Sequence, residues 1–347
     1  MATMTVTARW GNGLLGITLR RLLALPLVLL GIALIVFTLN RLVPGDPAQI
    51  YAGGDHANPA DVARLRELWG LDQPVVEQFV RYLGQLLRGD FGRSFSQRAE
   101  VLDVLAAKAP ATIELALAAL AIGIPTGVAL GVLSARRPRS WIDRMSSSLA
   151  VTGMSTPVFW LGFVLIFLFS VRLGWFPMNG RFSSFTRLDD VTGFMTLDAL
   201  LAGDGGAFVT AVQHLVLPAV TLAVLPAAMM ARFTRVSFVE VLGSQYILAA
   251  HAFGIRPRTI LWRLAAKNAV LPLINLLSLI VPSLVVGAVL VEIVFSWPGI
   301  GRFLLEALQS RDYIVVQSVT LLVGVLYVLL NLVADVAHVA LDPRARR

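Results

Sequence analysis

The chain has 347 residues, of which 57% are hydrophobic and 14% are charged, and its mean hydropathy is +0.76. Soluble domains are about 45–50% apolar and about 25% charged, so this composition excludes an ordinary water-soluble enzyme. The absence of cysteine excludes disulfides, thiol catalysis and zinc–thiolate sites. A formal charge of +8 raises the question of nucleic-acid binding, which the positions of the basic residues answer below.

Six runs of the sequence are free of charged residues and long enough to cross a bilayer. A spanning helix needs about 20 such residues, because an unpaired charge in hydrocarbon is costly. The first run is longer than a signal-peptide core of about 7–15 residues, so we expect it to be retained. We predict an all-α, polytopic membrane protein with six transmembrane helices, placed at about 22–40, 113–135, 145–171, 211–231, 269–291 and 315–337.

The distribution of Lys and Arg predicts the orientation, because these residues favour short cytoplasmic loops. With a cytoplasmic N-terminus, the inside segments contain 16 of them and the two shorter outside loops contain 5. The other 8 lie in segment 41–111, which is near the length at which the rule stops applying. We therefore expect both termini in the cytoplasm. This topology accounts for the basic charge, and no nucleic-acid partner is expected.

Two of the three outside segments, 41–111 and 172–204, differ in composition. In segment 41–111, a helix is expected from Pro59 to Gly70 and a second one after Pro74, where apolar residues recur at helical spacing. This segment is either an amphipathic cap on the membrane surface or a docking surface for an extracytoplasmic partner, and periodicity alone favours the cap. Segment 172–204 is rich in Gly, Ser, Thr and Asp and is expected to be an exposed loop.

The inside segment 232–267 is more informative. A helix is expected from Glu240 to Phe253, with Gly254 as its C-terminal cap, because glycine accepts a left-handed backbone. Pro257 is suited to start a second helix that reaches Lys267. One interpretation is an interfacial helix pair held by arginines beside anionic lipid. The other is a compact knob that a second protein grips closely, which would use the small residues Ala249, Ala250 and Ala252.

Motifs for enzymatic chemistry are absent from the sequence. It contains no HExxH, GxSxG, P-loop or GxGxxG motif, and its four histidines lack metal-ligand spacing. An intramembrane hydrolase would need a base beside Ser155, and none is evident. A self-powered carrier would use Glu114, Glu292 and Asp335 as a relay, but these residues lie on three different helices. We expect no catalytic site, no metal site and no cofactor on this chain.

One stretch carries a family resemblance. Residues 246–254 read Tyr-Ile-Leu-Ala-Ala-His-Ala-Phe-Gly, and Asn268 and Pro272 follow. This pattern resembles the cytoplasmic "EAA" loop of permeases in binding-protein-dependent ABC importers. Leu248 stands at the first acidic position of that loop, and His251 replaces a frequent arginine. Other motifs resemble the first permease type of the peptide/nickel branch, at 42–48, 70–74, 89–92, 157–162, 295–301 and 341–344.

The resemblance implies a type I ABC importer permease fold with three parts. These are an N-terminal region (1–111), a transmembrane domain (112–341) and a cytoplasmic tail (342–347). The N-terminal region contains the first transmembrane helix and segment 41–111, which would lie on the side that receives the ligand. Loop 240–268 would couple the chain to a cytoplasmic ATPase, with its first helix in a cleft of that subunit. The residues implied in coupling are Tyr246, Ala249, Ala250, His251, Ala252, Gly254, Asn268 and Pro272. Residues implied on the outer side or along the pathway are Pro44, Gly45, Asp46, Pro47, Glu292, Phe295, Trp297, Pro298, Gly299 and Gly301.

The resemblance also implies partners and cargo. The chain would form a heterodimer with a second permease in the inner membrane of a prokaryote, surrounded by lipid. Two cytoplasmic ATPase subunits would bind ATP and Mg, and an extracytoplasmic binding protein would deliver the ligand. Di- or oligopeptides are the expected cargo, with nickel chelates, glutathione-like peptides or another small solute as alternatives. Selectivity in such systems lies mainly in the binding protein.

Overall fold

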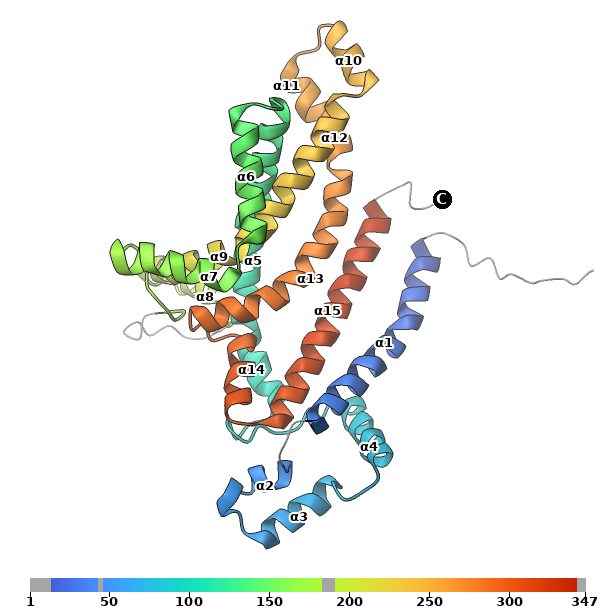
Figure 1. The fold of residues 1–347 in the computed structure, drawn as a ribbon, viewed down its shortest axis with the longest axis vertical. Helices are drawn as coiled ribbons and strands as arrows, with labels where there is room; N and C mark the ends of the chain where they lie inside the picture. The colour runs from blue at the N-terminus through green and yellow to red at the C-terminus, as the bar shows by residue number, and fades with distance from the viewer. Residues whose placement is uncertain (1–13, 43–45, 183–190, 342–347) are drawn as a thin grey trace, which may run out of the picture.

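The computed structural model describes residues 14–42, 46–182 and 191–341, and these ranges contain helices and no β-strand (Figure 1). The helices are α1 (Leu14–Leu42), α2 (Pro47–Tyr51), η1 (Gly54–His56), α3 (Pro59–Trp69), α4 (Val75–Leu87), α5 (Val101–Arg136), α6 (Trp141–Ser155), α7 (Val158–Leu165), η2 (Ile166–Arg172), α8 (Met195–Leu201), α9 (Gly205–Leu242), α10 (Gln245–Ala252), α11 (Pro257–Thr259), η3 (Ile260–Ala265), α12 (Ala266–Ala269), α13 (Leu271–Val294), α14 (Ile300–Gln309) and α15 (Tyr313–Leu341).

Within these ranges, α1, α5, α9, α13 and α15 are long and apolar enough to cross a membrane. A sixth span results if α6 and the α7–η2 segment count as one, although they meet at 108°. The prediction of an all-α polytopic chain is therefore confirmed, but run 145–171 is not the single helix that we expected. The break has a local cause, because Pro157 disfavours helical backbone at Thr156, and Thr156 is extended (φ −82°, ψ 124°).

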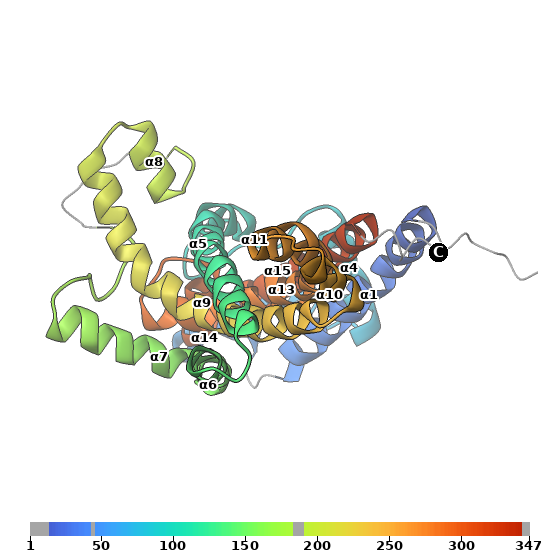
Figure 2. The same cartoon turned by 90° about the horizontal axis from the view of Figure 1, so that it is seen from above.

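The molecule has two distinct ends joined by the long helices (Figure 1). Helices α10 and α11 lie at one end, and α2 and α3 lie at the other. The beginning of α1 and the end of α15 both point toward the α10 end. Viewed from above, α7 and α8 extend on the side opposite to α1 (Figure 2).

The tightest packing lies between α5 and α9. Gly123, Gly127 and Gly131 recur every four residues on α5 and face α9, which is the small-residue pattern that lets helix backbones approach closely in membranes. A Cβ atom at position 127 would lie 2.5 Å from the carbonyl oxygen of Ala227. No side chain larger than hydrogen fits there, so α5 and α9 form one closely joined pair.

The connecting segments differ from expectation in three places. Helix α5 begins at Val101, inside the region expected as an outer segment, and α8 forms within the expected loop 172–204. The helix expected over 240–253 is interrupted, because α9 continues to Leu242 and Ser244 is extended (φ −72°, ψ 152°) before α10 begins. The helix expected from Pro59 is confirmed, and Gly70 ends it in the left-handed conformation (φ 63°).

Candidate functional site

The expected coupling loop folds into α10 packed on the segment from α11 to α12, at one end of the molecule (Figure 1). Two residues of α10, Ile247 and Ala250, are buried against Ile260 and Ala265 of the second segment. The small side chain of Ala250 therefore serves packing inside the loop. This apolar contact fixes which face of α10 points outward.

The outward face of α10 is mostly apolar, and its side chains are exposed in the described structure. Leu248 and Phe253 are exposed, and Phe253 has 85% of its surface free. Ala249, His251 and Ala252 are exposed on the same helix. Exposed apolar side chains grouped on a rigid element mark a surface for another molecule.

Two residues that the sequence places 22 positions apart meet in this loop. The Asn268 side-chain amide donates a hydrogen bond to the Tyr246 hydroxyl, at 2.8 Å. Gly254 forms the turn between the two segments with φ 73°, and nothing lies within 4 Å of the place where its Cβ would be. The left-handed backbone favours glycine at this position, whereas the surroundings would leave room for a side chain. Pro272 lies in the first turn of α13, beyond the loop.

The motif at 295–301 builds a junction between α13 and α14, and Glu292 is its centre. The Glu292 side chain is fully buried. Its Oε2 accepts hydrogen bonds from the backbone N–H groups of Gly301 (2.7 Å) and Arg302 (3.1 Å), at the start of α14. A carboxylate in this position satisfies helix N–H groups that have no partner within the helix. Oε1 accepts a hydrogen bond from Thr112 of α5, at 2.6 Å.

The other residues of this motif close the junction. The Trp297 indole N–H donates to the carbonyl oxygen of Ala111 on α5, at 2.8 Å, and the Trp297 side chain is buried. Phe295 is buried beside it. A Cβ atom at Gly299 would collide with the Glu292 carboxylate, and one at Gly301 would lie 2.5 Å from Cα of Val289. Pro298 lies between Trp297 and Gly299, in the turn that leads into α14.

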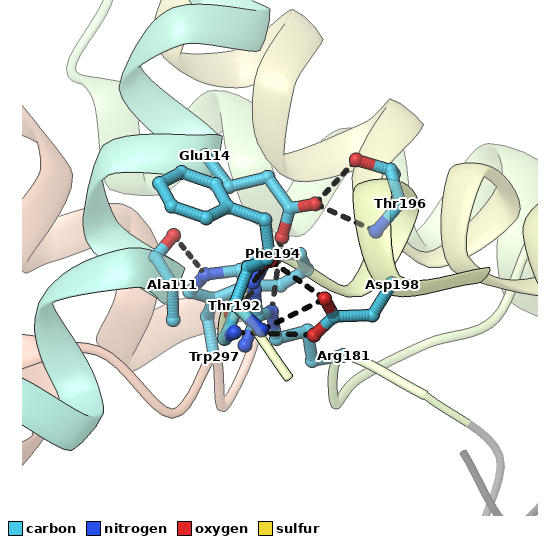
Figure 3. A network of polar contacts seen from close by, with 9 residues as sticks. Ala111, Glu114, Arg181, Thr192, Phe194, Thr196, Asp198 and Trp297 are labelled. Carbon is cyan, nitrogen blue, oxygen red and sulfur yellow. Dashed lines mark hydrogen bonds and ion pairs between the residues drawn. The ribbon is translucent and has the colours of Figure 1, made fainter. Parts of the chain in front are cut away.

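A second buried carboxylate, Glu114 of α5, lies next to this junction (Figure 3). Arg181 forms an ion pair with its Oε2, with donor–acceptor distances of 2.5 and 3.0 Å. The backbone N–H and the hydroxyl of Thr196, at the start of α8, donate to Oε1 at 2.9 and 2.6 Å. The Arg181 guanidinium also lies 5.7 Å from the centre of a Trp297 ring. This network ties segment 172–204 to α5 and to the α13–α14 junction.

Asp198 of α8 holds the turn beside Arg181 (Figure 3). Its carboxylate accepts hydrogen bonds from the backbone N–H and hydroxyl of Thr192, at 2.9 and 2.6 Å, and from the N–H of Gly193 at 3.1 Å. Burial raises the pKa of Asp198, but these hydrogen bonds together outweigh it, so the pKa is lowered from its usual value. Arg181 in turn donates to the Gly193 carbonyl, at 2.5 Å.

The motif after α1 is a helix start at the end where α2 and α3 lie. Pro44 and Gly45 fall outside the described residues. Asp46 caps α2 by accepting from the N–H of Ala48 at 3.0 Å, and Pro47 occupies the first turn of that helix. The second carboxylate oxygen of Asp46 forms an ion pair with Arg66 of α3, at 2.6 Å. This motif therefore holds α2 and α3 together.

Sequence reasoning missed the role of Arg181 and the function of Glu292 as a helix cap. A signal for the first existed, because a single Glu in an apolar run needs a buried cation or hydrogen-bond donors. A self-powered carrier would need a relay among Glu114, Glu292 and Asp335, and the two residues whose side chains are described do not form one. Both carboxylates are bound by hydrogen bonds to separate sets of donors.

Two family models match most of the chain. Residues 127–347 match the family described as binding-protein-dependent transport system inner membrane component, and residues 14–116 match its N-terminal counterpart. A solved structure of the methionine ABC transporter MetNI, in an inward-facing conformation, is 20% identical with a TM-score of 0.45, and covers 70% of this chain and 94% of that chain.

Curated relatives match nearly the whole chain. The di/tripeptide transport system permease protein DppB of Pseudomonas aeruginosa (strain UCBPP-PA14) is 40% identical over 94% of this chain and 97% of its own length. The dipeptide permease DppB of Escherichia coli (strain K12) is 40% identical over 94% and 98%. The glutathione transport system permease protein GsiC of Salmonella paratyphi A is 37% identical over 96% and 99%. The chain therefore belongs to the family of binding-protein-dependent transport system inner membrane components, the membrane permeases of ABC transporters.

Proposed function

We propose that this chain is a permease subunit of an ATP-driven importer that passes di- and tripeptides through the inner membrane. Relatives named as dipeptide and di/tripeptide permeases, 40% identical over nearly their full length, support the substrate class. A glutathione permease at 37% identity supports glutathione, itself a peptide, as the second candidate. Nickel chelates remain an expectation of the sequence motifs alone.

The observation that carries the coupling role is the exposed face of α10 with Phe253 at its end. This face lies at the end of the molecule toward which both α1 and α15 point (Figure 1). In the proposed orientation, that end is cytoplasmic and α10 inserts into a cleft of an ATPase subunit. ATP and Mg bind to two such subunits, and this chain contributes no catalytic step.

The opposite end then faces the binding protein. Helices α2, α3 and α4 receive the loaded protein there, and a second, homologous permease completes the pathway as a heterodimer. The buried junction around Glu292 and Glu114 holds the outer ends of α5, α13 and α14 in a fixed relation. In this proposal, closing of the ATPases pulls on α10 and rotates the permease pair from an inward-open to an outward-open state.

The test is a substitution at the turn of the coupling loop. Gly254→Val forces a β-branched residue into φ 73° without a steric clash, so it disturbs the turn and leaves the core untouched. We expect peptide uptake by the assembled importer to fall at least 10-fold, with the chain still present in the membrane. The matched control is Gly203→Val, which has φ 67° and equally open surroundings outside this loop.

Two outcomes would count against the proposal. Unchanged uptake by the Gly254→Val variant would remove the coupling role from this loop. Purification of the chain from gently solubilised membranes without any ATPase, even after crosslinking through α10, would contradict membership of an importer complex. Co-purification with two ATPases and a second permease is the expected result.

A further inference from the structure

A cavity of about 790 Å³ lies at the α2–α3 end of the molecule, outside the sites described above. Its walls come from the end of α1, from α2, α3 and α4, from the segment between α4 and α5, and from the beginning of α15. Sites for small molecules commonly measure about 300–1,000 Å³. The cavity is therefore large enough for a small ligand.

The charges around this cavity are of both signs and mostly unpaired. Four arginines line it, namely Arg41, Arg66, Arg81 and Arg93. Four carboxylates line it as well, namely Asp46, Asp72, Asp90 and Glu100. Among the residues that the structure describes, Arg66 with Asp46 is the one ion pair that joins members of these two sets. Three cations and three anions thus line the same space, and no ion pair joins them to one another or to other residues in the described part of the chain.

Arg81 and Arg93 each use one terminal nitrogen as a hydrogen-bond donor among the described residues. One terminal nitrogen of Arg81 donates to the Gln73 side chain, at 3.0 Å, and one of Arg93 donates to the carbonyl oxygen of Arg98, at 2.9 Å. A guanidinium has five N–H groups, so most of these donors are available to an anion. Arg41 lies 5.1 Å from the centre of the Phe37 ring, which orients its guanidinium beside the cavity.

Aromatic and polar groups complete the lining. Tyr51 and Trp69 meet edge to face, with ring centres 5.0 Å apart, and both line the cavity. Asn40 donates to Gln317 at 2.7 Å where α1 faces α15. Tyr82 and Gln317 both line the cavity as well. The site therefore offers ring faces for apolar side chains and polar groups for a peptide bond.

We propose that this cavity binds a short zwitterionic peptide before it enters the translocation pathway. An α-carboxylate fits guanidinium donors in a two-bond geometry, and an α-ammonium fits the unpaired carboxylates. A ligand with one sign of charge would leave half of these groups without a partner. A metal cation fits poorly, because arginines surround the space and no group of three metal-ligating side chains is found in the described part of the chain. The proposal rests on peptide import as the function.

The test measures binding of radiolabelled alanyl-phenylalanine to the purified permease–ATPase complex without its binding protein. We expect saturable binding that weakens at least 10-fold with Arg81→Gln and with Asp72→Asn, both in the lining. Arg88→Gln at the end of α4 and Asp61→Asn in α3 are the matched controls, because both residues are exposed and neither lines the cavity. N-acetylated peptide should remain sensitive to Arg81→Gln and lose its sensitivity to Asp72→Asn.

The outcomes separate this inference from the proposed function. If the complex binds no peptide while uptake with the binding protein is normal, the cavity is not a peptide site and the importer role stands. If uptake of peptides is also absent, the proposed function itself fails. Displacement of the peptide by phosphatidylethanolamine, with lipid binding that is weakened by the same two lining substitutions, would assign the cavity to a lipid headgroup and overturn the proposal.

Discussion

The α13–α14 junction and the α10 loop are built in opposite ways. At the junction, Glu292 and Glu114 are buried and bind groups 180 and 67 positions away in the chain. In the loop, the side-chain hydrogen bond with the greatest sequence separation joins Asn268 to Tyr246, only 22 positions away. Phe253 is exposed. The first region is a fixed framework that this chain completes by itself. The second is a small folded unit whose outer surface carries exposed apolar side chains.

The largest effect in this comparison is expected from Arg181→Met. It leaves the buried Glu114 carboxylate without its cation, and breaking a buried ion pair from one side costs about 3–5 kcal/mol. The free energy of unfolding in detergent micelles measures this loss. Arg172→Met is the control, since Arg172 is exposed and lies over the Phe167 ring, where a cation–π contact contributes about 0.5–1 kcal/mol. Equal losses in the two variants would show that Arg181 is not a structural centre.

Glu292→Gln should come next. The substitution keeps the size of the side chain but directs an amide N–H₂ toward donors on Thr112, Gly301 or Arg302, which costs about 1–3 kcal/mol for each group left unpaired. The same unfolding measurement applies. Glu306→Gln is the control, because the Glu306–Arg302 pair is exposed and such pairs contribute about 0.2–1 kcal/mol. A loss no greater than that of the control would contradict the capping role.

Tyr246→Phe should have a smaller effect, confined to the other region. It removes the acceptor of the Asn268 amide on an exposed surface, which costs about 0.5–1.5 kcal/mol. Hydrogen exchange of the backbone should accelerate in residues 245–268 and remain unchanged in α14. Faster exchange in both regions would show that the loop and the junction are coupled more tightly than the contacts indicate.

Asp198→Asn is expected to change how stability depends on pH, with a loss that is present at neutral pH and shrinks in acid. The folded pKa of Asp198 lies below its usual value, so the carboxylate contributes stability above the unfolded pKa of about 3.9 and loses it as the pH falls through the folded pKa. The acid branch of the unfolding curve should therefore flatten in the variant. A branch with the same slope as that of the unaltered chain would assign acid sensitivity to other groups.

The sequence predicted the helices well because their signals are local. Apolar run lengths located five spans, and the Asn58–Pro59 start and the Gly70 end of α3 follow from capping chemistry. The bend at Pro157 had a local signal too, although its angle of 108° depends on tertiary packing. Hydropathy does not predict the angle between two consecutive helices.

The buried polar networks were harder to predict because their partners are distant. Arg181 lies in a stretch rich in Gly and Ser, and nothing in its neighbours points to Glu114. The motif around Trp297 indicated importance without indicating a role, because the donors to Glu292 lie nine and ten positions later. The roles of the coupling-loop residues remain predictions, since they concern contacts with another protein.

The glycine-lined contact between α5 and α9 should keep the same helix separation throughout the proposed rotation of the permease. Backbones this close leave no layer of side chains that could slide or repack. Since the chain contains no cysteine, spin labels can be attached to any two introduced cysteines without background. A label pair across α5 and α9 should report the same distance in every state of the transport cycle, and it provides the internal ruler against which all other movements can be measured.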